Sequence, residues 1–330
     1  MALGEFDLIA TYFQRPAAAA SVAGARVSGV ELGIGDDCAL LRAPAAGMQW
    51  AVSCDMLVEG RHFLSTVAPA RLAHKALAVN LSDLAACGAQ PRAFTLALAL
   101  PRADEAFLAP FAAGLFALAD AHGIELVGGD TTAGPLNLCI TVFGELPAGQ
   151  ALLRSGARDG DELWVSGTLG DARLALEVFR GTLTLEGRDF DNVRQAMELP
   201  QPRVALGLAL RGIAHSAIDV SDGLLGDLGH VLRRSGVGAV VQVDALPRSA
   251  VLAAQPLALQ RECGLAGGDD YELLFSAPAA RHDAVRAAGR TAGVAVTCIG
   301  RIEAAPGLRL CDAEGRPLAA PYRGFDHFKS

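Results

Sequence analysis

The sequence predicts two consecutive domains, each built from a mixture of helices and strands. At 330 residues the chain is longer than one typical core requires. Hydrophobic residues make up 52% of it, enough for large buried cores, and strand-like and helix-like patterns are mixed in both halves. This order favours two α+β domains over a single doubly wound sheet. The stretch 147–150 (Pro-Ala-Gly-Gln) is the candidate boundary, which gives domains at residues 1–148 and 149–330.

Two helices are expected in the first half, between short strand-like runs. The first covers 69–86 and is followed by Gly88, a residue type that commonly ends helices. The second begins at Asp104, a good N-cap, covers 104–121 and closes at His122-Gly123. The strands expected in this half cover 29–34, 50–53, 94–100, 124–127 and 138–146.

The second half opens with the loop Arg154-Ser155-Gly156-Ala157. A strand over 162–166 then leads through 167–171 into a helix. Further helical patterns cover 203–211, 224–234 and 279–288, and further strands cover 239–243, 271–276 and 297–302. No short-period repeat of the solenoid kind is present.

Composition and charge argue against several classes of protein. No apolar run approaches the ~20 residues of a membrane span, and Glu5 and Asp7 do not fit the basic start of a signal peptide. The net charge of −8 argues against a nucleic-acid partner. Seven cysteines without a Cys-x-x-Cys motif argue against a disulfide framework or a zinc ribbon. We therefore expect a cytoplasmic protein with neither a membrane nor a nucleic-acid partner.

Acidic clusters beside glycine recur along the chain, at 35–37, 128–130, 219–223 and 267–270. The first three follow strand-like runs and the last precedes one, so their carboxylates can converge at strand ends. Two carboxylates ~4 Å apart repel by roughly 4 kcal/mol at an effective dielectric near 20. Four such clusters in one pocket therefore require bridging cations. The pattern predicts a site for several metal ions, of the kind that holds phosphates.

Asp83 is informative even when taken alone. It lies in an apolar helical pattern with Leu77, Leu81 and Leu84, and Asn80 is on the same face. A carboxylate in that position must be paired, metal-bound or exposed. Each of the other carboxylates is, taken singly, also compatible with an ordinary turn or helix cap. Their joint occurrence favours the metal site.

The usual nucleotide-binding motifs are absent. Only Lys75 and Lys329 are lysines and neither follows a glycine, which excludes a P-loop. A His-Arg-Asp loop is missing, and Gly33-x-Gly35 runs into two aspartates instead of completing a dinucleotide fingerprint. Ser221 lies among acids and not in Gly-x-Ser-x-Gly, and 219–223 lacks the ligand spacing of an EF-hand. What remains is a phosphate site made of magnesium and main-chain amides.

Several segments carry a resemblance when they are taken in order. They are Gly4-Glu5-Phe6, 31–40 (ELGIGDDCAL), 75–86 (KALAVNLSDLAA), 128–132 (GGDTT), 216–224 (SAIDVSDGL), 270–273 (DYEL) and 324–328 (GFDHF). At these motifs the chain resembles the thiamine-monophosphate kinase family. That family shares a superfamily with aminoimidazole ribonucleotide synthetase, selenophosphate synthetase and the hydrogenase-maturation dehydratase. The match runs nearly end to end, and the order of its segments makes it specific.

The resemblance implies a reaction and an architecture. ATP would give its terminal phosphoryl group to thiamine monophosphate, making thiamine diphosphate with the help of several Mg²⁺ ions. The acceptor is already an anionic phosphate, so direct in-line transfer needs neither a covalent nucleophile nor a strong general base. The implied fold is an N-terminal α/β domain whose strands form a barrel across a homodimer, followed by an α+β C-terminal domain.

The resemblance also implies site residues, matched position by position. The implied magnesium positions are Asp37, Ser53, Cys54, Asp55, Asp83, Asp130, Asp219 and Asp222. The ATP positions are Gly129, Asp130, Arg154 and Ser221, and the thiamine phosphate positions are His62, Asp269 and Phe325. Cys54 departs from the family's threonine, which leaves only a main-chain carbonyl oxygen there. Asp269 departs from a glutamate and shortens the reach toward substrate.

Other interpretations stay open. Taken alone, Arg154 fits solvated surface, His62 a surface turn and Phe325 core packing. Another ATP-using member of the superfamily is the nearest alternative, although 1–30 lacks the reactive cysteine of a selenophosphate synthetase and the tail 328–330 lacks that of the hydrogenase-maturation enzyme. A non-catalytic magnesium-nucleotide sensor is the alternative of another class. It would release no ADP when thiamine phosphate is added.

Overall fold

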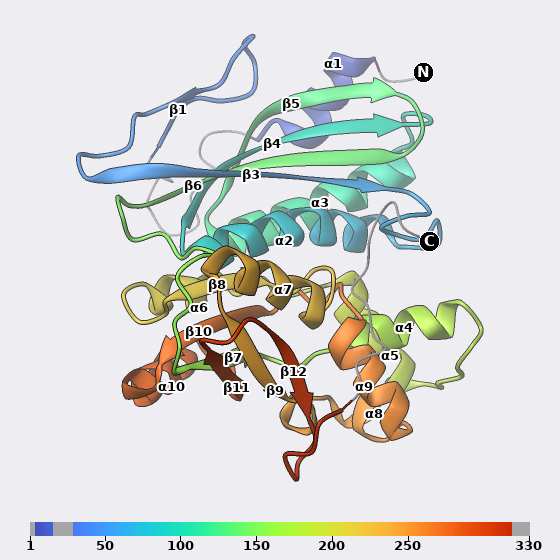
Figure 1. Ribbon diagram of the computed structural model, residues 1–330. Helices are drawn as coiled ribbons and strands as arrows, with labels where there is room; N and C mark the ends of the chain where they lie inside the picture. The colour runs from blue at the N-terminus through green and yellow to red at the C-terminus, as the bar shows by residue number, and fades with distance from the viewer. Residues whose placement is uncertain (1–3, 16–28, 319–330) are drawn as a thin grey trace. The chain divides into compact units, whose positions relative to one another are not determined.

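The computed structural model describes residues 4–15 and 29–318. The chain divides into two compact units, the first containing Met1–Leu84 with Ala89–Gly149 and the second containing Ala85–Gly88 with Gln150–Ser330. Figure 1 shows the helices and strands of both. No helix within the described ranges is long and apolar enough to cross a membrane.

The first unit is a four-stranded sheet with the order β3-β6-β4-β5. Helices α2 and α3 lie along one of its faces (Figure 1). Strands β4 and β5 are parallel, and the other neighbours are antiparallel. The elements of the sheet layer are β3 (Met48–Val58), α2 (Pro69–Cys87), β4 (Gln90–Leu100), α3 (Glu105–His122), β5 (Glu125–Ala133) and β6 (Asn137–Pro147). Outside it lie α1 (Glu5–Leu8), the π-helix Ile9–Phe13, and the ribbon of β1 (Val30–Leu32) and β2 (Leu40–Leu41).

Both helices predicted in this unit are confirmed, with the expected ends. Asp104 accepts the main-chain N–H of Ala106 at 3.0 Å, and Gly123 adopts the left-handed conformation at φ 61°. Leu77 and Leu81 of α2 are fully buried, as is Phe94 of β4. These apolar side chains fill the helix-covered side of the sheet.

The opposite face of the sheet is open in the described residues. Along β3 the exposed positions alternate with buried or half-buried ones, and Val52 and Met56 are 58% and 54% exposed. Residues of β6 alternate in the same way, with Ile140 and Val142 on the buried side. The sheet is not closed on itself, because β3 and β5 each have a neighbour on one side only.

The second unit is built on a six-stranded sheet with the order β12-β9-β11-β7-β10-β8. Only β12 and β9 are parallel among these pairs. The strands are β7 (Asp161–Ser166), β8 (Ser216–Asp219), β9 (Gly238–Gln242), β10 (Leu273–Pro278), β11 (Val296–Glu303) and β12 (Gly307–Cys311). The helices are α4 (Asp171–Phe179), α5 (Arg188–Glu198), α6 (Val204–Leu210), α7 (Leu224–Ser235), α8 (Ala250–Ala253), α9 (Leu257–Ala266) and α10 (His282–Ala292). Single 3-10 turns cover Val243–Ala245 and Ala279–Arg281.

The structure corrects two strand ends that matter for function. The sequence placed Asp55 and Asp130 in turns after short strands, but both lie inside longer ones, β3 and β5. The reason is uninterrupted pairing: Asp55 is opposite Ile140 of β6, and Asp130 is opposite Ala97 of β4. Elements α5, α9 and β12 were not predicted. The sequence of α5 has few apolar residues, and the sequence of α9 has only a weak helical periodicity.

Candidate functional site

In the first unit, oxygen-bearing side chains gather between β3 and α2. The hydroxyl of Ser53 donates to Oδ2 of Asp83 at 2.5 Å. The main-chain N–H of Asp55 donates to Oδ1 of Asn80 at 3.0 Å, and Asn80 Nδ2 donates to the carbonyl of Ala76. Asn80 is fully buried, while Ser53, Asp55 and Asp83 are half-buried. The sequence left Asp83 as paired, metal-bound or exposed; in the structure it is half-buried and accepts a hydrogen bond from Ser53.

The ring of His62 is oriented by the strand that precedes it. Its Nδ1 accepts the main-chain N–H of Val58 at 3.0 Å. Because Nδ1 is the acceptor, the neutral ring carries its proton on Nε2. The Nε2–H group can therefore donate a hydrogen bond to a phosphate oxygen.

Asp37 and Asp130 stand apart from this group. Both are exposed, and in residues 4–15 and 29–318 no hydrogen bond or ion pair joins either carboxylate to another predicted ligand. The register of the sheet explains the position of Asp130. It is opposite Ala97, which is exposed, whereas Ser53 is opposite Val142, which is buried on the helix side. Asp130 and Ser53 thus belong to opposite faces of the sheet.

In the second unit, the loop 219–223 connects β8 to α7. Asp219 is buried at the end of β8, and Ser221 and Asp222 are half-buried. Oδ2 of Asp227, in the first turn of α7, accepts the main-chain N–H groups of Ser221 at 3.0 Å and Asp222 at 3.1 Å. Asp227 itself is buried. Burial and the nearby Asp222 carboxylate raise the pKa of Asp227 to about 7 from 3.8, against the effect of the two N–H groups.

Sequence reasoning missed Asp227. Its signal was present, because an aspartate in the first turn of a helix is favoured there by the exposed N–H groups. The residue lies four positions past Gly223, within reach of the loop that the acidic motif defines. Asp227 therefore shapes the main chain at two predicted site residues.

The loop 219–223 is joined to the loop 267–272 by main-chain hydrogen bonds. Asp269 N–H donates to the carbonyl of Ser221 at 2.8 Å, and Tyr271 N–H donates to that of Val220 at 2.9 Å. Asp269 and Tyr271 have positive φ values of 63° and 52°. Non-glycine residues adopt this conformation at a cost, and such strain is common at functional sites. Two predicted positions for different ligands, Ser221 and Asp269, are thus side by side.

Glycine allows these loops to approach. A Cβ on Gly268, at φ 69°, would lie 2.6 Å from the carbonyl oxygen of Ser221. A Cβ on Gly223, at φ 102°, would lie 2.9 Å from the main-chain carbon of Ala266. Any side chain at either position would push the two loops apart.

A buried ionic network supports the loop 267–272 from behind. Arg203 donates to both carboxylate oxygens of Glu272, at 2.7 and 2.5 Å, and Ser166 donates to the same carboxylate. Asp270, two residues before Glu272, accepts a hydrogen bond from the main-chain N–H of Gly170 at 2.8 Å. Burial raises the pKa of Asp270 well above its ordinary value. Asp270 and Glu272 thus fix the main chain on both sides of Tyr271.

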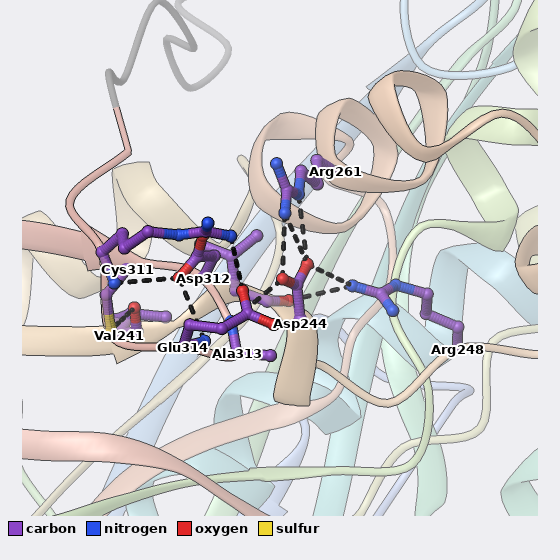
Figure 2. Close-up of polar contacts among 10 residues, drawn as sticks. Val241, Asp244, Arg248, Arg261, Cys311, Asp312, Ala313 and Glu314 are labelled. Carbon is purple, nitrogen blue, oxygen red and sulfur yellow. Dashed lines mark hydrogen bonds and ion pairs between the residues drawn. The ribbon is translucent and has the colours of Figure 1, made fainter.

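Figure 2 shows how α9, which leads into this loop, is held at its middle. The Asp244 carboxylate accepts from Arg261 of α9 at 2.9 Å and from the main-chain N–H of Ala313 at 3.1 Å, and Arg248 lies 3.9 Å away. Asp312 in turn accepts the main-chain N–H of Glu314 at 3.1 Å. Asp244 therefore connects α9 with the turn that follows β12.

The donor chemistry of the first unit fits magnesium. Ser53, Asp55 and Asp83 offer hydroxyl and carboxylate oxygens, which are the ligands of this hard cation. The thiol of Cys54 does not fit, and it is exposed on the open face of the sheet, opposite Thr141. Over the described part of the chain, no three His, Cys, Asp or Glu side chains form a group that could hold a metal ion. The predicted carboxylates of the sheet layer in the first unit thus come from separate elements, Asp55 from β3, Asp83 from α2 and Asp130 from β5.

The remaining predicted residues are placed as follows. Arg154 is exposed, and its main-chain carbonyl accepts a hydrogen bond from Ser235 Oγ at 3.3 Å. The positive charge of its side chain acts to lower the pKa of Asp227. Gly129 precedes Asp130 in β5 at φ 147°. Phe325 lies outside the described residues.

The chain is similar to known proteins over most of its length. Residues 35–146 match the model of the AIR synthase related protein N-terminal domain, and residues 158–312 match that of its C-terminal domain. The thiamine-monophosphate kinase of Salmonella typhimurium is 47% identical over 331 residues, covering 99% of each chain. That of Escherichia coli K12 is 45% identical with the same coverage.

Solved structures give the same picture. The crystal structure of thiamine-monophosphate kinase from Stenotrophomonas maltophilia K279a has a TM-score of 0.81 and 47% identity, over 86% of this chain and 91% of that one. The structure of AaThiL complexed with AMPPCP and TMP has a TM-score of 0.75 and 28% identity, over 87% and 90%. Hydrogenase maturation protein HypE in complex with ATP, at 21% identity and a TM-score of 0.69 over 86% and 88%, shares the fold.

Proposed function

The chain belongs to the thiamine-monophosphate kinase family and is a kinase, and we propose that it transfers the terminal phosphoryl group of ATP directly, in line, to thiamine monophosphate with the help of several magnesium ions. The assignment of the two substrates rests on the similarity to AaThiL, whose structure was solved in complex with AMPPCP and TMP. AMPPCP is an ATP analogue, so that structure pairs a nucleotide with the phosphate acceptor. The likeness extends over 87% of this chain.

Magnesium would be held first by the oxygens between β3 and α2. Ser53, Asp55 and Asp83 are the donors there, together with the main-chain carbonyl of Cys54. Asp37, Asp130, Asp219 and Asp222 are the further carboxylates that we assign to metal. When bound, the ions would neutralise charge on the phosphate groups. A carboxylate already held by the Ser53 hydroxyl is oriented before any ion arrives, which reduces the ordering that binding requires.

The remaining residues would bind and orient the two anionic substrates. The loop of Ser221 and Asp222, ordered by Asp227, is assigned to ATP together with Gly129, Asp130 and Arg154. His62 would donate Nε2–H to the phosphate of thiamine monophosphate, since its Nδ1 is engaged by Val58. Asp269 and Phe325 complete the proposed acceptor positions. No residue is assigned as a covalent nucleophile or general base, because the acceptor oxygen is already anionic.

The open face of the first unit supports a homodimer. Val52 and Met56 are 58% and 54% exposed, on a sheet whose edge strands β3 and β5 are each paired on one side only within residues 29–318. We assign this surface to a second copy of the chain, with the two sheets together forming the barrel. Met56→Asp would then reduce the mass in sedimentation equilibrium to that of one chain. The exposed Leu257→Asp, in the second unit, would leave the mass unchanged. Because the proposed reaction consumes ATP, we assign the protein to the cytoplasm.

The deciding experiment is coupled ADP release with ATP and Mg²⁺, comparing thiamine monophosphate with free thiamine as the acceptor. We expect turnover only with the monophosphate, and loss of at least a hundredfold in Asp83→Asn and Asp130→Asn. Asp191→Asn, an exposed acid of α5, is the matched control and keeps full activity. Turnover with free thiamine would overturn the acceptor assignment. ATP binding without acceptor-dependent ADP release would favour the sensor or another superfamily member.

A further inference from the structure

One hydroxyl at the end of α7 holds the loop that precedes β7. The Oγ of Ser235, the last residue of α7, accepts the main-chain N–H groups of Gly156 at 3.1 Å and Ala157 at 3.2 Å. It donates its own proton to the main-chain carbonyl of Arg154 at 3.3 Å. A hydroxyl has one proton and two lone pairs, so these three contacts use its whole hydrogen-bonding capacity. The loop 154–157 is therefore fixed to α7 through Ser235.

The same loop is attached on its other side to the segment that enters β8. The main-chain N–H of Ala217, in β8, donates to the carbonyl of Leu153 at 2.9 Å. A Cβ on Gly156, at φ 124°, would lie 2.4 Å from the carbonyl oxygen of His215, so this close approach requires glycine. These contacts set where the loop passes β8, and the contact with α7 sets its other side.

The helix itself does not need the Ser235 hydroxyl at its end. Gly236 follows in the left-handed conformation at φ 69°, and its N–H donates to the carbonyl of Leu232. This is the usual way in which a glycine closes a helix. The hydrogen bonds of the Ser235 hydroxyl go instead to the loop 154–157.

The side chain of Arg154 acts on residues of α7 that precede Ser235. Burial and nearby arginines, Arg154 among them, lower the pKa of His230. The charge of Arg154 also acts to lower the pKa of Asp227, in the first turn. At a rise of about 1.5 Å per residue, Asp227 and Ser235 are separated by about 12 Å along the helix. One helix thus holds the loop 219–223 at its start and the main chain of Arg154 at its end.

We propose that Ser235 is a positioning residue for ATP, which holds the main chain of Arg154 so that its guanidinium can reach the phosphate groups. This inference rests on the proposed function, which assigns Arg154 to ATP. Guanidinium groups bind phosphate oxygens well, but ordering a long side chain and its loop on binding costs free energy. A main chain that is fixed beforehand reduces that cost. Loss of the Ser235 hydroxyl should therefore weaken nucleotide binding.

Substitutions at Ser235 test this role through the affinity for AMPPCP, measured by calorimetry with Mg²⁺. Ser235→Ala removes all three contacts, and we expect the Kd to rise about five- to tenfold. Ser235→Thr keeps the hydroxyl and should recover most of the affinity. Ser235→Cys keeps nearly the same size with a weaker hydrogen-bonding group, so its Kd should lie between those of the wild type and Ser235→Ala.

Thr291→Ala is the matched control. Thr291 also lies in the last turn of a helix, α10, that ends at a left-handed glycine, and within residues 29–318 its hydroxyl has no hydrogen bond to another loop. The affinity of this variant for AMPPCP should equal that of the wild type. Coincident thermal unfolding of all variants shows that each is folded.

A double mutant separates positioning from general loosening of the second unit. In the Arg154→Ala background, Ser235→Ala should change the Kd for AMPPCP by less than about twofold, because the side chain that it positions is gone. A residue with a merely structural role would raise the Kd by the same factor in both backgrounds. That result, or wild-type affinity in Ser235→Ala, would overturn the proposal.

Steady-state kinetics distinguish this inference from the proposed reaction. In acceptor-dependent ADP release, Ser235→Ala should raise the KM for ATP and leave the KM for thiamine monophosphate within about twofold of the wild type. An equal rise in both KM values would contradict the positioning role. Wild-type protein that binds AMPPCP but releases no ADP would count against the proposed reaction alone, because the Kd series would still decide the role of Ser235.

Discussion

Asp227 accepts the main-chain N–H of Asp222 at 3.1 Å, on the same oxygen that accepts the N–H of Ser221. A single carboxylate oxygen at the start of α7 thus fixes the loop that carries two proposed ATP and metal positions. The conformation of this loop in the second unit therefore depends on Asp227 as a hydrogen-bond acceptor. The relation can be tested because asparagine also has one oxygen in that position.

Asp227→Ala removes the acceptor and leaves two main-chain N–H groups without their partner. An unsatisfied buried donor costs about 1–3 kcal/mol, so we expect the free energy of unfolding to fall by at least that amount. The KM for ATP should rise about tenfold or more, which corresponds to ~1.4 kcal/mol of lost binding. Asp227→Asn keeps the acceptor oxygen and should restore most of both quantities. Urea unfolding and steady-state kinetics measure them; equal damage by the two substitutions would refute the acceptor role.

The pH dependence of stability provides a second test of Asp227. Its pKa is raised to about 7 in the folded protein, from an ordinary 3.8 that applies when the chain is unfolded. Between these two values the folded chain holds a proton that the unfolded chain releases, so stability falls as the pH rises through this window. Relative to Asp227→Asn, the wild type should therefore lose stability from pH 3.8 to about 7. Urea midpoints measured in chelator would show this, and parallel profiles for the two proteins would exclude it.

The sequence alone predicted the elements with strong local signals and the residue types of the site. Asp104 and Gly123 mark both ends of α3 because capping is a local interaction. The sequence could not predict which face of the sheet each site residue occupies. Asp130 is opposite Ala97 because β5 is longer than expected and pairs with β4 in this register. Long-range pairing, and not local propensity, determines that position.

The contacts between site residues could not be predicted from local sequence patterns either. Ser53 and Asp83 are separated by 30 residues, and Arg154 and Ser235 by 81. Each pair meets only because two elements pack or pair at one particular register. Asp83 could be recognised as an acid in an apolar helical pattern that must be paired, metal-bound or exposed, but Ser53 could not be identified as its partner. For Asp227 the local signal was present, because an aspartate is favoured in the first turn of a helix. Its role depends on how the preceding loop folds, and this could not be predicted.

Gly129 and Gly128 are adjacent in β5 but should differ sharply in their tolerance of alanine. A Cβ on Gly129, at φ 147°, would lie 1.9 Å from the carbonyl oxygen of Leu96, whereas a Cβ on Gly128 meets nothing closer than Thr95 Cγ2 at 4.0 Å. Gly129→Ala must shift β5 against β4, and we expect a loss of about 2–4 kcal/mol of unfolding free energy. Gly128→Ala should stay within about 1 kcal/mol of the wild type. Chemical denaturation measures both, and similar losses would show that the close approach to Leu96 is not what requires glycine.

The ion pair between Arg203 and Glu272 should contribute far more to stability than an exposed pair of similar geometry. The Glu272 side chain is only 7% exposed, so Arg203→Ala leaves a buried carboxylate without its partner. Removing one partner of a buried pair costs about 3–5 kcal/mol. The Arg301 side chain is 68% exposed in its pair with Glu303, and Arg301→Ala should cost less than about 1 kcal/mol.

Two further variants separate charge from geometry at Arg203. Arg203→Lys keeps the charge but cannot make both hydrogen bonds to Glu272, so its free energy of unfolding should lie between those of the wild type and Arg203→Ala. Adding Glu272→Gln to Arg203→Ala removes the unpaired charge and should recover part of the loss. Urea unfolding of the set measures the coupling. If Arg203→Ala were as mild as Arg301→Ala, the ion pair would not be what holds the loop 267–272, and its other hydrogen bonds, from Ser166, from Gly170 and to 219–223, would be sufficient.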